Sequence, residues 1–120
     1  WKLAPRTWEA AILWDNDPRL PNFMIEELRK SVDIGSPIAA DQLIGDNLPY
    51  DGALKNDTMY RHCTRRGLVQ ALLEVRQDLI SDREGVVRWA DRLEPILRDA
   101  NDMSRMHELC VYPSRTEPKG

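Results

Sequence analysis

Glu74, Arg76 and Asp78 are the residues whose types and spacing point most directly to chemistry. They alternate in Glu74-Val-Arg-Gln-Asp78, at the C-terminal end of an otherwise apolar segment. In a strand, alternate residues project to one side, so these three charges are predicted to share a face. That end of a strand is where open α/β sheets bind ligands. Because buried charges are costly unless they pair, the alignment indicates either a functional site or an internal Arg76–carboxylate network.

The segment Gly45-Asp-Asn-Leu-Pro-Tyr-Asp-Gly52 is a second candidate. Its glycines, proline and short polar residues are typical of a tight loop with inward-facing hydrogen-bonding groups. The same composition is typical of a plain surface turn. The segment by itself therefore predicts a loop and leaves its role open.

The histidines and cysteines do not form a metal site or a nucleophilic centre by themselves. Zinc requires three or four His, Cys or carboxylate ligands, often in pairs such as His-x-x-Glu or Cys-x-x-Cys. His62, His107, Cys63 and Cys110 form no such pair, so no metal ligands are expected from this chain. The isolated thiols are typical of a reducing compartment, which favours a cytoplasmic location. The sequence also lacks a Gly-x-Ser-x-Gly elbow and a glycine-rich phosphate loop.

The elements that must position these residues follow from apolar spacing, turn residues and helix caps. The run at 68–75 is apolar almost without interruption, which indicates a strand covered on both faces, as in an α/β sheet. In chain order, the predicted elements are a buried strand at 9–14, a helix from Pro21 to Gly35 with Met24, Ile25, Leu28 and Val32 on one face, a two- or three-residue strand at 43–44, a short helix at 58–66 ended by Gly67, the strand at 68–75, and a helix after Ser81.

The last helix and the residues that follow it carry further predictions. Ser81-Asp-Arg-Glu84 matches a capping box. Pro95 predicts a kink or break near Glu94, because a proline inside a helix removes a hydrogen bond. Periodicity ends after Asn101, and residues 114–120 are expected to be disordered. The predicted apolar face of the helix consists of Val86, Ala90, Leu93, Leu97 and Ala100, flanked by Trp89 and Ile96.

Length and charge limit the class of protein. The chain has 120 residues, which fits one domain at most. Its 17 basic and 20 acidic residues are well mixed, so the net charge of -3 gives no footprint for nucleic acid or anionic lipid. No apolar run approaches the ~18–20 residues of a membrane span. Trp1 is not an initiator methionine, so we expect a chain that is processed, truncated or part of something longer.

Taken in order, these motifs resemble the C-terminal half of the N-formylglutamate amidohydrolase family. The resemblance covers residues 5–100, so we expect 1–100 to be half of such a domain and 101–120 to be an extension or tail. The matching segments are Pro5-Arg-Thr-Trp8, Leu13-Trp-Asp-Asn-Asp-Pro-Arg-Leu20, Gly45-Asp-Asn-Leu-Pro-Tyr50, Arg66-Gly-Leu68, Leu73-Glu-Val-Arg-Gln-Asp-Leu-Ile80 and residues 89–93.

The resemblance implies a zinc-dependent hydrolase of carboxypeptidase-like (phosphorylase/hydrolase-like) α/β fold, present here as a partial three-layer sheet with flanking helices. Its substrate would be a small acidic N-acyl amino acid, from which it cleaves a formamide or a related amide. Glu74 matches the general acid/base of the family, and Arg76 would bind a substrate carboxylate or an oxyanion. Asp46, Asn47 and Tyr50 would line the same pocket from the loop.

The sequence also departs from the family in ways that keep a second hypothesis open. The metal-binding histidine and glutamate motifs of the family lie in its N-terminal half, so the zinc ligands would come from that missing half or from a companion chain. The family often has Pro-His where this chain has Val69-Gln70. The chain is therefore predicted to be part of a metal-dependent amidohydrolase, or else a non-catalytic fold remnant that acts as an interaction or assembly subunit of a larger complex.

Overall fold

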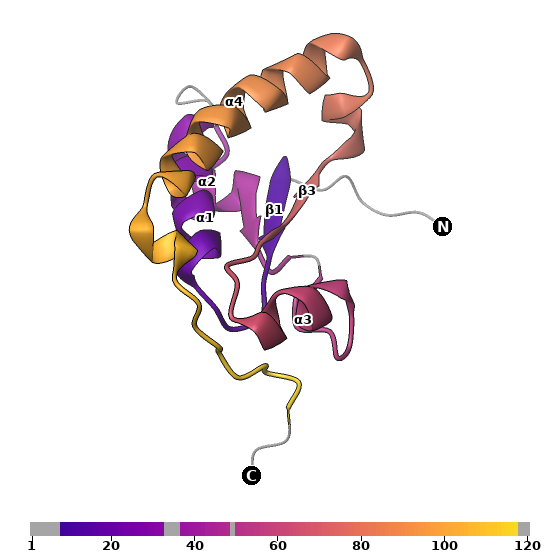
Figure 1. Ribbon diagram of the computed structural model, residues 1–120. Helices are drawn as coiled ribbons and strands as arrows, with labels where there is room; N and C mark the ends of the chain where they lie inside the picture. The colour runs from indigo at the N-terminus through magenta and orange to yellow at the C-terminus, as the bar shows by residue number, and fades with distance from the viewer. Residues whose placement is uncertain (1–7, 33–36, 49, 118–120) are drawn as a thin grey trace, which may run out of the picture.

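Three short strands form a mixed sheet at the centre of the molecule (Figure 1). The computed structural model describes residues 8–32, 37–48 and 50–117. The strand order is β2-β1-β3, with β2 parallel and β3 antiparallel to the central β1. The α/β class predicted from the sequence is therefore confirmed. The strands are β1 Ala10–Leu13, β2 Ile44–Asp46 and β3 Leu72–Val75.

In the part of the chain that the structure describes, four α-helices and three 3-10 turns pack against one side and one end of this sheet (Figure 1). Most of the predicted elements are present, and the short α2 is an addition that apolar spacing did not reveal. Helix α1 begins before Pro21, because the Asp17 carboxylate accepts a hydrogen bond from the Arg19 amide at 3.0 Å. The helices are α1 Arg19–Ser31, α2 Ala40–Leu43, α3 Thr58–His62 and α4 Arg83–Asn101, and the turns are η1 Thr64–Arg66, η2 Gln77–Ile80 and η3 Ser104–His107.

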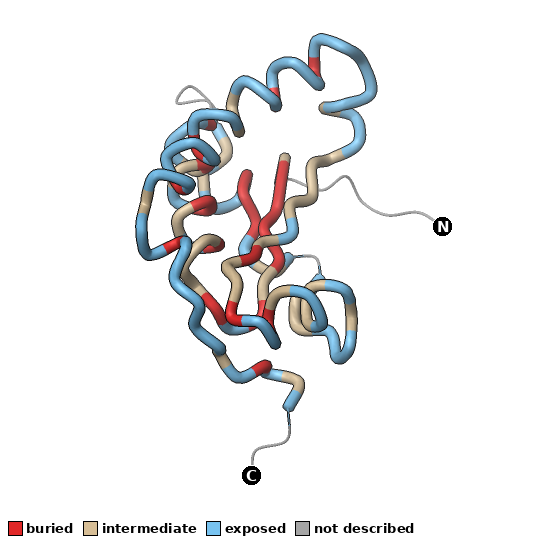
Figure 2. The backbone as a smooth tube through the Cα atoms, viewed as in Figure 1, coloured by how far each residue is buried: buried red, intermediate tan, exposed pale blue. Residues whose placement is uncertain are grey.

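The core lies between one face of the sheet and the helices α1 and α4. Ala10 and Ile12 of β1 are buried there against the predicted apolar face of α1, and Trp89 and Ile96 of α4 complete the cluster. Figure 2 shows buried residues concentrated in the central strands and on the inner side of α1. The Gly52 loop approaches the end of β1, and Met59 of the short α3 lines the pocket on the opposite face of the sheet. The predicted three-layer arrangement stays a prediction.

The buried face of α4 differs from the predicted one. Gly85, Trp89, Ile96 and Ala100 are buried, whereas Val86 is 51% exposed and Leu97 is 48% exposed. The helix is rotated so that Trp89, its largest apolar side chain, enters the core, because burying an aromatic ring removes the most apolar surface from water.

Pro95 does not interrupt α4, so of the kink or break expected near Glu94 the break does not occur. Both Pro95 and Asp91 are exposed. In a regular helix the Asp91 carbonyl would accept a hydrogen bond from the amide of residue 95, and proline has no amide hydrogen. Because this side of the helix is exposed, the carbonyl can be hydrated instead, which makes the proline tolerable.

Helix α4 is capped by Asp82 and not by Ser81. The Asp82 carboxylate accepts a hydrogen bond from the Gly85 amide at 2.7 Å, whereas the Ser81 hydroxyl donates to the Asp78 carbonyl. We predict that Asp82→Ala lowers the free energy of unfolding by about 1 kcal/mol, the usual effect of losing an N-cap. Ser81→Ala is the matched control and is expected to cost less than about 0.5 kcal/mol. Chemical denaturation of both variants measures the difference, and an equal loss would contradict this assignment of the cap.

The chain after α4 is ordered as far as Glu117, contrary to the disorder expected from residue 114 onward. It runs down one side of the domain to the end that carries α3 (Figure 1). The Cys110 amide donates to the carbonyl of Gly67, whose positive φ of 71° ends η1 as the sequence predicted. Pro118 to Gly120 lie outside the described residues, as do the matched residues 5–7, Gly35 and Pro49. Within the described ranges, no helix combines the length and apolar character needed to cross a membrane.

Candidate functional site

The antiparallel pairing of β3 separates the predicted site residues into two places. Leu72 at the start of β3 lies opposite Leu13, and Val75 at its end lies opposite Ala10. The C-terminal end of β3 therefore lies beside the start of β1, and the Arg76 amide donates to the Glu9 carbonyl at 2.8 Å. Arg76 therefore lies toward the other end of the sheet from the C-terminal ends of β1 and β2, where the loop after β2 begins.

Strand β3 is an edge strand and is shorter than the predicted 68–75. Leu72 is 42% exposed and the rest of the strand is half-buried, so the expected cover on both faces is wrong for the described residues. The residues before Leu72 form no ladder with β1. Gln70 is held instead by Thr64, to whose hydroxyl oxygen its amide nitrogen donates at 2.9 Å.

Glu74 lines a pocket on the face of the sheet away from α1 and α4. The side chain lies opposite Ala11, while Leu73 and Val75 face the core, as strand alternation predicted. The pocket has a volume of about 180 Å³. Among the described residues, the Glu74 carboxylate has no hydrogen-bond or ion-pair partner. The walls are formed by Leu13, Trp14, Asp15, Tyr50, Asp51, Gly52, Leu54, Asp57, Met59, Gln70, Leu72 and Glu74.

The polar loop after β2 builds one wall of this pocket. Tyr50 lines the pocket as expected and is 58% exposed. Asp46 and Asn47 are not among the residues that line it, and the structure places their side chains against Trp14 and Gly52. The Asp46 carboxylate accepts from the Trp14 indole nitrogen at 2.6 Å. The Asn47 side-chain oxygen accepts from the amides of Trp14 at 2.8 Å and Gly52 at 3.1 Å.

Arg76 forms the internal ion pair that the sequence left open as an alternative. Its Nε lies 2.6 Å from Oδ1 of Asp78, and its Nη2 lies 3.1 Å from Oδ2. These bonds raise the pKa of Arg76 and lower that of Asp78. Strand alternation does not extend to Asp78, because η2 begins at Gln77. The pair therefore closes the turn after β3.

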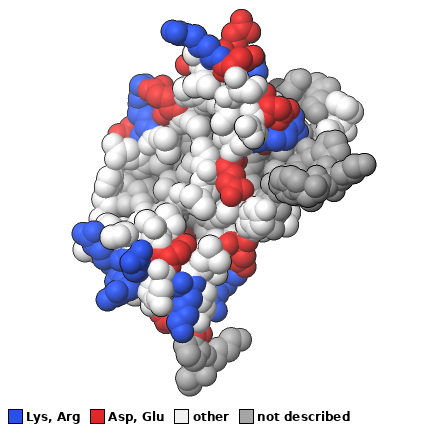
Figure 3. Space-filling view, turned by 90° about the vertical axis from the view of Figure 1, so that its right-hand side faces the viewer, with Lys and Arg blue, Asp and Glu red and all other residues white. Residues whose placement is uncertain are grey.

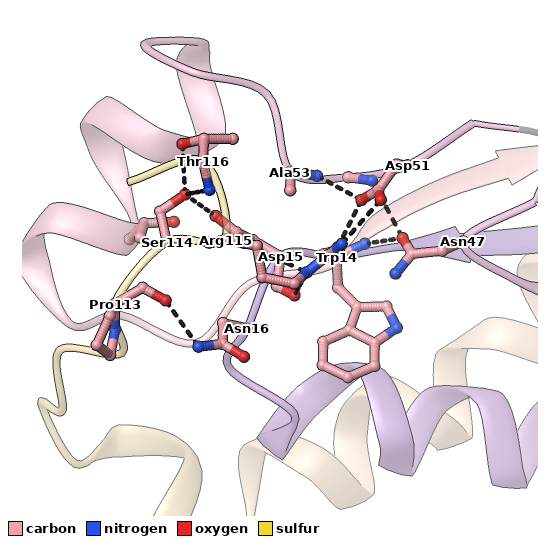
Figure 4. A network of polar contacts seen from close by, with 12 residues as sticks. Trp14, Asp15, Asn16, Asn47, Asp51, Ala53, Pro113, Ser114, Arg115 and Thr116 are labelled. Atoms are coloured by element: carbon pink, nitrogen blue, oxygen red, sulfur yellow. Dashed lines mark hydrogen bonds and ion pairs between the residues drawn. The ribbon is translucent and has the colours of Figure 1, made fainter. Parts of the chain in front are cut away.

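Arg115 is a residue of this site that sequence reasoning missed. It comes from the C-terminal segment and reaches the pocket wall near Asp51 (Figure 4). Its guanidinium donates to both Asp51 carboxylate oxygens and to the carbonyls of Trp14 and Asp15. The Ser114 hydroxyl and the Arg115 amide donate to the Asp15 carboxylate. No local sequence motif indicates these contacts, because about a hundred residues separate Asp15 from Arg115 in sequence.

The pocket wall is acidic. Among the described lining residues, Asp15, Asp51, Asp57 and Glu74 are carboxylates and none is a lysine or arginine. Asp57 caps α3 by accepting from the Tyr60 amide, and Asp51 is paired with Arg115. Hydrogen bonds from Arg115 lower the pKa of the Asp51 carboxyl, and burial opposes this effect. Because this pKa is lowered on folding, the stabilisation is present above the ordinary carboxyl range and is lost as pH falls through the lowered value.

The donor set does not fit zinc. In residues 8–32, 37–48 and 50–117, no three His, Cys, Asp or Glu side chains are grouped so that they could hold a metal ion. Figure 3 shows the face that lies on the right of Figure 1: its middle is mostly neither acidic nor basic but includes Asp or Glu side chains, and lysine and arginine side chains lie toward its margins. What this part of the chain offers a ligand is therefore apolar surface and carboxylates.

No protein-family model, no curated protein and no solved structure matches this chain.

Proposed function

We propose that this chain supplies the acid/base glutamate of an amidohydrolase that cleaves N-acyl amino acids, N-formylglutamate being the first substrate to test. One observation carries the proposal: the Glu74 carboxylate lies in a pocket wall without a partner among the described residues. Asp51 and Asp57 in the same wall are engaged by Arg115 and by the Tyr60 amide, so the half-buried Glu74 is the carboxylate that this part of the wall leaves available to a ligand. The resemblance of the segment 73–80 to the amidohydrolase family supports the same role.

The chemistry proposed for Glu74 is proton transfer. The carboxylate takes a proton from a water molecule whose oxygen attacks the acyl carbon of the amide. Glu74 then returns the proton to the leaving nitrogen as the C–N bond breaks, which releases the carboxylic acid and the free amine. Positioned carboxylates typically accelerate such steps by about 10²–10⁴-fold. The apolar wall formed by Leu13, Leu54 and Leu72 fits the alkyl part of a small substrate.

Zinc enters the proposal only as an expectation from the family. The described residues provide no ligand cluster, so under this proposal the metal ligands would come from an N-terminal half or from a companion chain. The test is release of formate from N-formyl-L-glutamate by the complete gene product, with N-acetyl-L-glutamate and N-formyl-L-leucine as comparison substrates. Turnover of a formyl substrate supports the proposal. No turnover of any of the three substrates, with stoichiometric metal bound, would reject it.

A non-catalytic assembly subunit is the second candidate. It is favoured by the donor set, which contains no metal-ligand group among the described residues, and by exposed apolar side chains such as Leu109 and Val111 at 72% and 64%. Native mass spectrometry with metal analysis separates the two candidates. A stable, zinc-free complex with an unrelated protein supports the subunit. A companion polypeptide that brings His-x-x-Glu and stoichiometric zinc supports the hydrolase.

Arg76 provides a separate prediction about substrate binding. If its guanidinium binds the carboxylate of an acidic substrate, Arg76→Ala raises KM at least ~10-fold, the effect of losing a charge-assisted hydrogen bond, with kcat little changed. Asp78→Asn is the matched variant, because it loosens the ion pair without removing the cation. Steady-state kinetics of both variants decide the point: an unchanged KM in Arg76→Ala would leave Arg76 a purely structural role in the turn after β3.

A further inference from the structure

The C-terminal strap, defined as residues 108–117, connects two separate parts of the pocket wall (Figure 4). One part is the end of β1, where Arg115 Nε donates to the Asp15 carbonyl at 2.7 Å and Nη2 donates to the Trp14 carbonyl at 2.9 Å. The other is the Asp51 loop, defined as residues 50–54, where Nη1 lies 2.8 Å from Oδ2 of Asp51. A single guanidinium therefore ties the loop to the strand end.

The geometry of these contacts distinguishes positioning from substrate binding. Arg115 has five N–H donors, and four of them are used in the contacts with Trp14, Asp15 and Asp51. A guanidinium so engaged has one donor left for a substrate. Its planar fork holds the Asp51 carboxylate at both oxygens, which fixes orientation as well as distance.

The strap is seated by contacts that are independent of Arg115. Arg19, held by Asp17, donates to the carbonyls of Arg105 and Glu108 where the strap begins. The Cys110 amide donates to the Gly67 carbonyl at 2.9 Å, and the buried Ser114 hydroxyl donates to Asp15. These contacts bring Arg115 to the pocket already oriented, so it can hold the more exposed Asp51 loop in place.

The charge of the pocket wall favours a cation at this position. Four carboxylates share the pocket wall, and Asp51 belongs to a loop whose side chains at Tyr50 and Leu54 are more than half exposed. Like charges in one site repel each other. Arg115 offsets part of this charge, because its Nε lies 3.6 Å from Oδ1 of Asp15 and its Nη1 lies 2.8 Å from Oδ2 of Asp51.

We propose that Arg115 is a positioning residue, which holds the Asp51 loop against the end of β1 so that Tyr50 and Gly52 form the wall facing Glu74. Its consequence for catalysis rests on the proposed function, whereas its consequence for the loop does not. Loss of Arg115 therefore opens the pocket and weakens substrate binding more than it slows the chemical step.

The test compares Arg115→Ala with Arg115→Lys, Asp51→Asn and the exposed control Arg65→Ala. Hydrogen exchange in this chain is the first readout. The amides of Gly52 and Ala53, which donate to Asn47 and Asp51, are expected to exchange at least ~10-fold faster in Arg115→Ala and Asp51→Asn. Arg65→Ala is expected to match the unmodified chain. Lysine keeps the charge but not the fork, so Arg115→Lys is expected to fall between them.

Two further readouts separate positioning from general stabilisation. An NMR titration is expected to show a higher pKa for the Asp51 carboxyl in Arg115→Ala, with an intermediate value in the lysine variant. In the complete gene product, KM is expected to rise ~10-fold while kcat changes less than ~3-fold. Unchanged exchange at Gly52 and Ala53, or faster exchange throughout β1 and α1 as well, would overturn the inference. Absence of turnover in every variant, with the loop effect present, would instead count against the proposed function alone.

Discussion

Glu74→Gln is expected to reduce amide hydrolysis by the complete gene product at least ~100-fold, which is the lower range for loss of a general acid/base. Glutamine has nearly the same shape as glutamate and still donates and accepts hydrogen bonds, but it cannot carry a proton between water and the leaving nitrogen. The loss should therefore appear in kcat and in kcat/KM alike. Formate release under saturating and limiting substrate measures both, and the zinc content of the variant is expected to be unchanged.

The control for this substitution uses the same chemical change elsewhere. Glu94 lies on the exposed side of α4 and pairs with Arg98 in the next turn, so Glu94→Gln removes a carboxylate that does not line the pocket. Both variants are expected to unfold within ~0.5 kcal/mol of the unmodified chain, because neither side chain is buried in the core. Undiminished hydrolysis in Glu74→Gln, with the fold intact, would remove Glu74 from the mechanism and leave the assembly subunit as the better hypothesis.

The first two long elements of this chain, β1 and α1, could be predicted because their sequence signals are local. The apolar run of β1 and the apolar face of α1 are set by residues that lie close together in sequence, and both elements are present in the structure. Helix α4 shows the limit of this approach: its length was predictable, but the side that becomes buried was not. Trp89 and Leu97 lie on different sides of the helix, and only the shape of the core decides which of them enters it.

The candidate site was predictable at Glu74 and Tyr50 and not in its surroundings. Strand alternation placed Glu74 away from the core, and that placement needs only the identity of the strand. The position of Arg76 at the C-terminal end of an apolar strand predicts that it belongs to the same site. The direction in which β3 pairs with β1 is a property of the whole sheet, and it placed Arg76 at the other end. Arg115 could not be predicted as a site residue, because its side-chain partners are 64 to 101 residues away in sequence.

Gly52→Ala is expected to lower the free energy of unfolding by about 3 kcal/mol and to open the pocket, the upper range for forcing an atom into a packed site. A Cβ at Gly52 would lie 2.2 Å from the Trp14 nitrogen, 2.6 Å from its Cα and 2.7 Å from the Leu13 carbonyl carbon. These atoms belong to the backbone at the end of β1, so they cannot rotate away as a flexible side chain could. The clash can be relieved only by moving the Asp51 loop, which breaks the Gly52–Asn47 hydrogen bond and draws Asp51 from Arg115.

Gly45→Ala is the matched substitution, because it adds the same methyl group in the strand that leads into the same loop. Its Cβ would lie 3.3 Å from the side chains of Ala11 and Leu48, a tight contact that small shifts can relieve. We expect a loss below about 1.5 kcal/mol in denaturant titrations, with the exchange of Gly52 and Ala53 unchanged. In Gly52→Ala the Asp51 loop should move away from the end of β1. The Ala53 amide is therefore expected to exchange faster, while the amides of β1 stay protected. A Gly52→Ala variant that is as stable as Gly45→Ala and keeps the loop amides protected would contradict the close approach of the Asp51 loop to the end of β1. Tyr50 could then not form a wall facing Glu74.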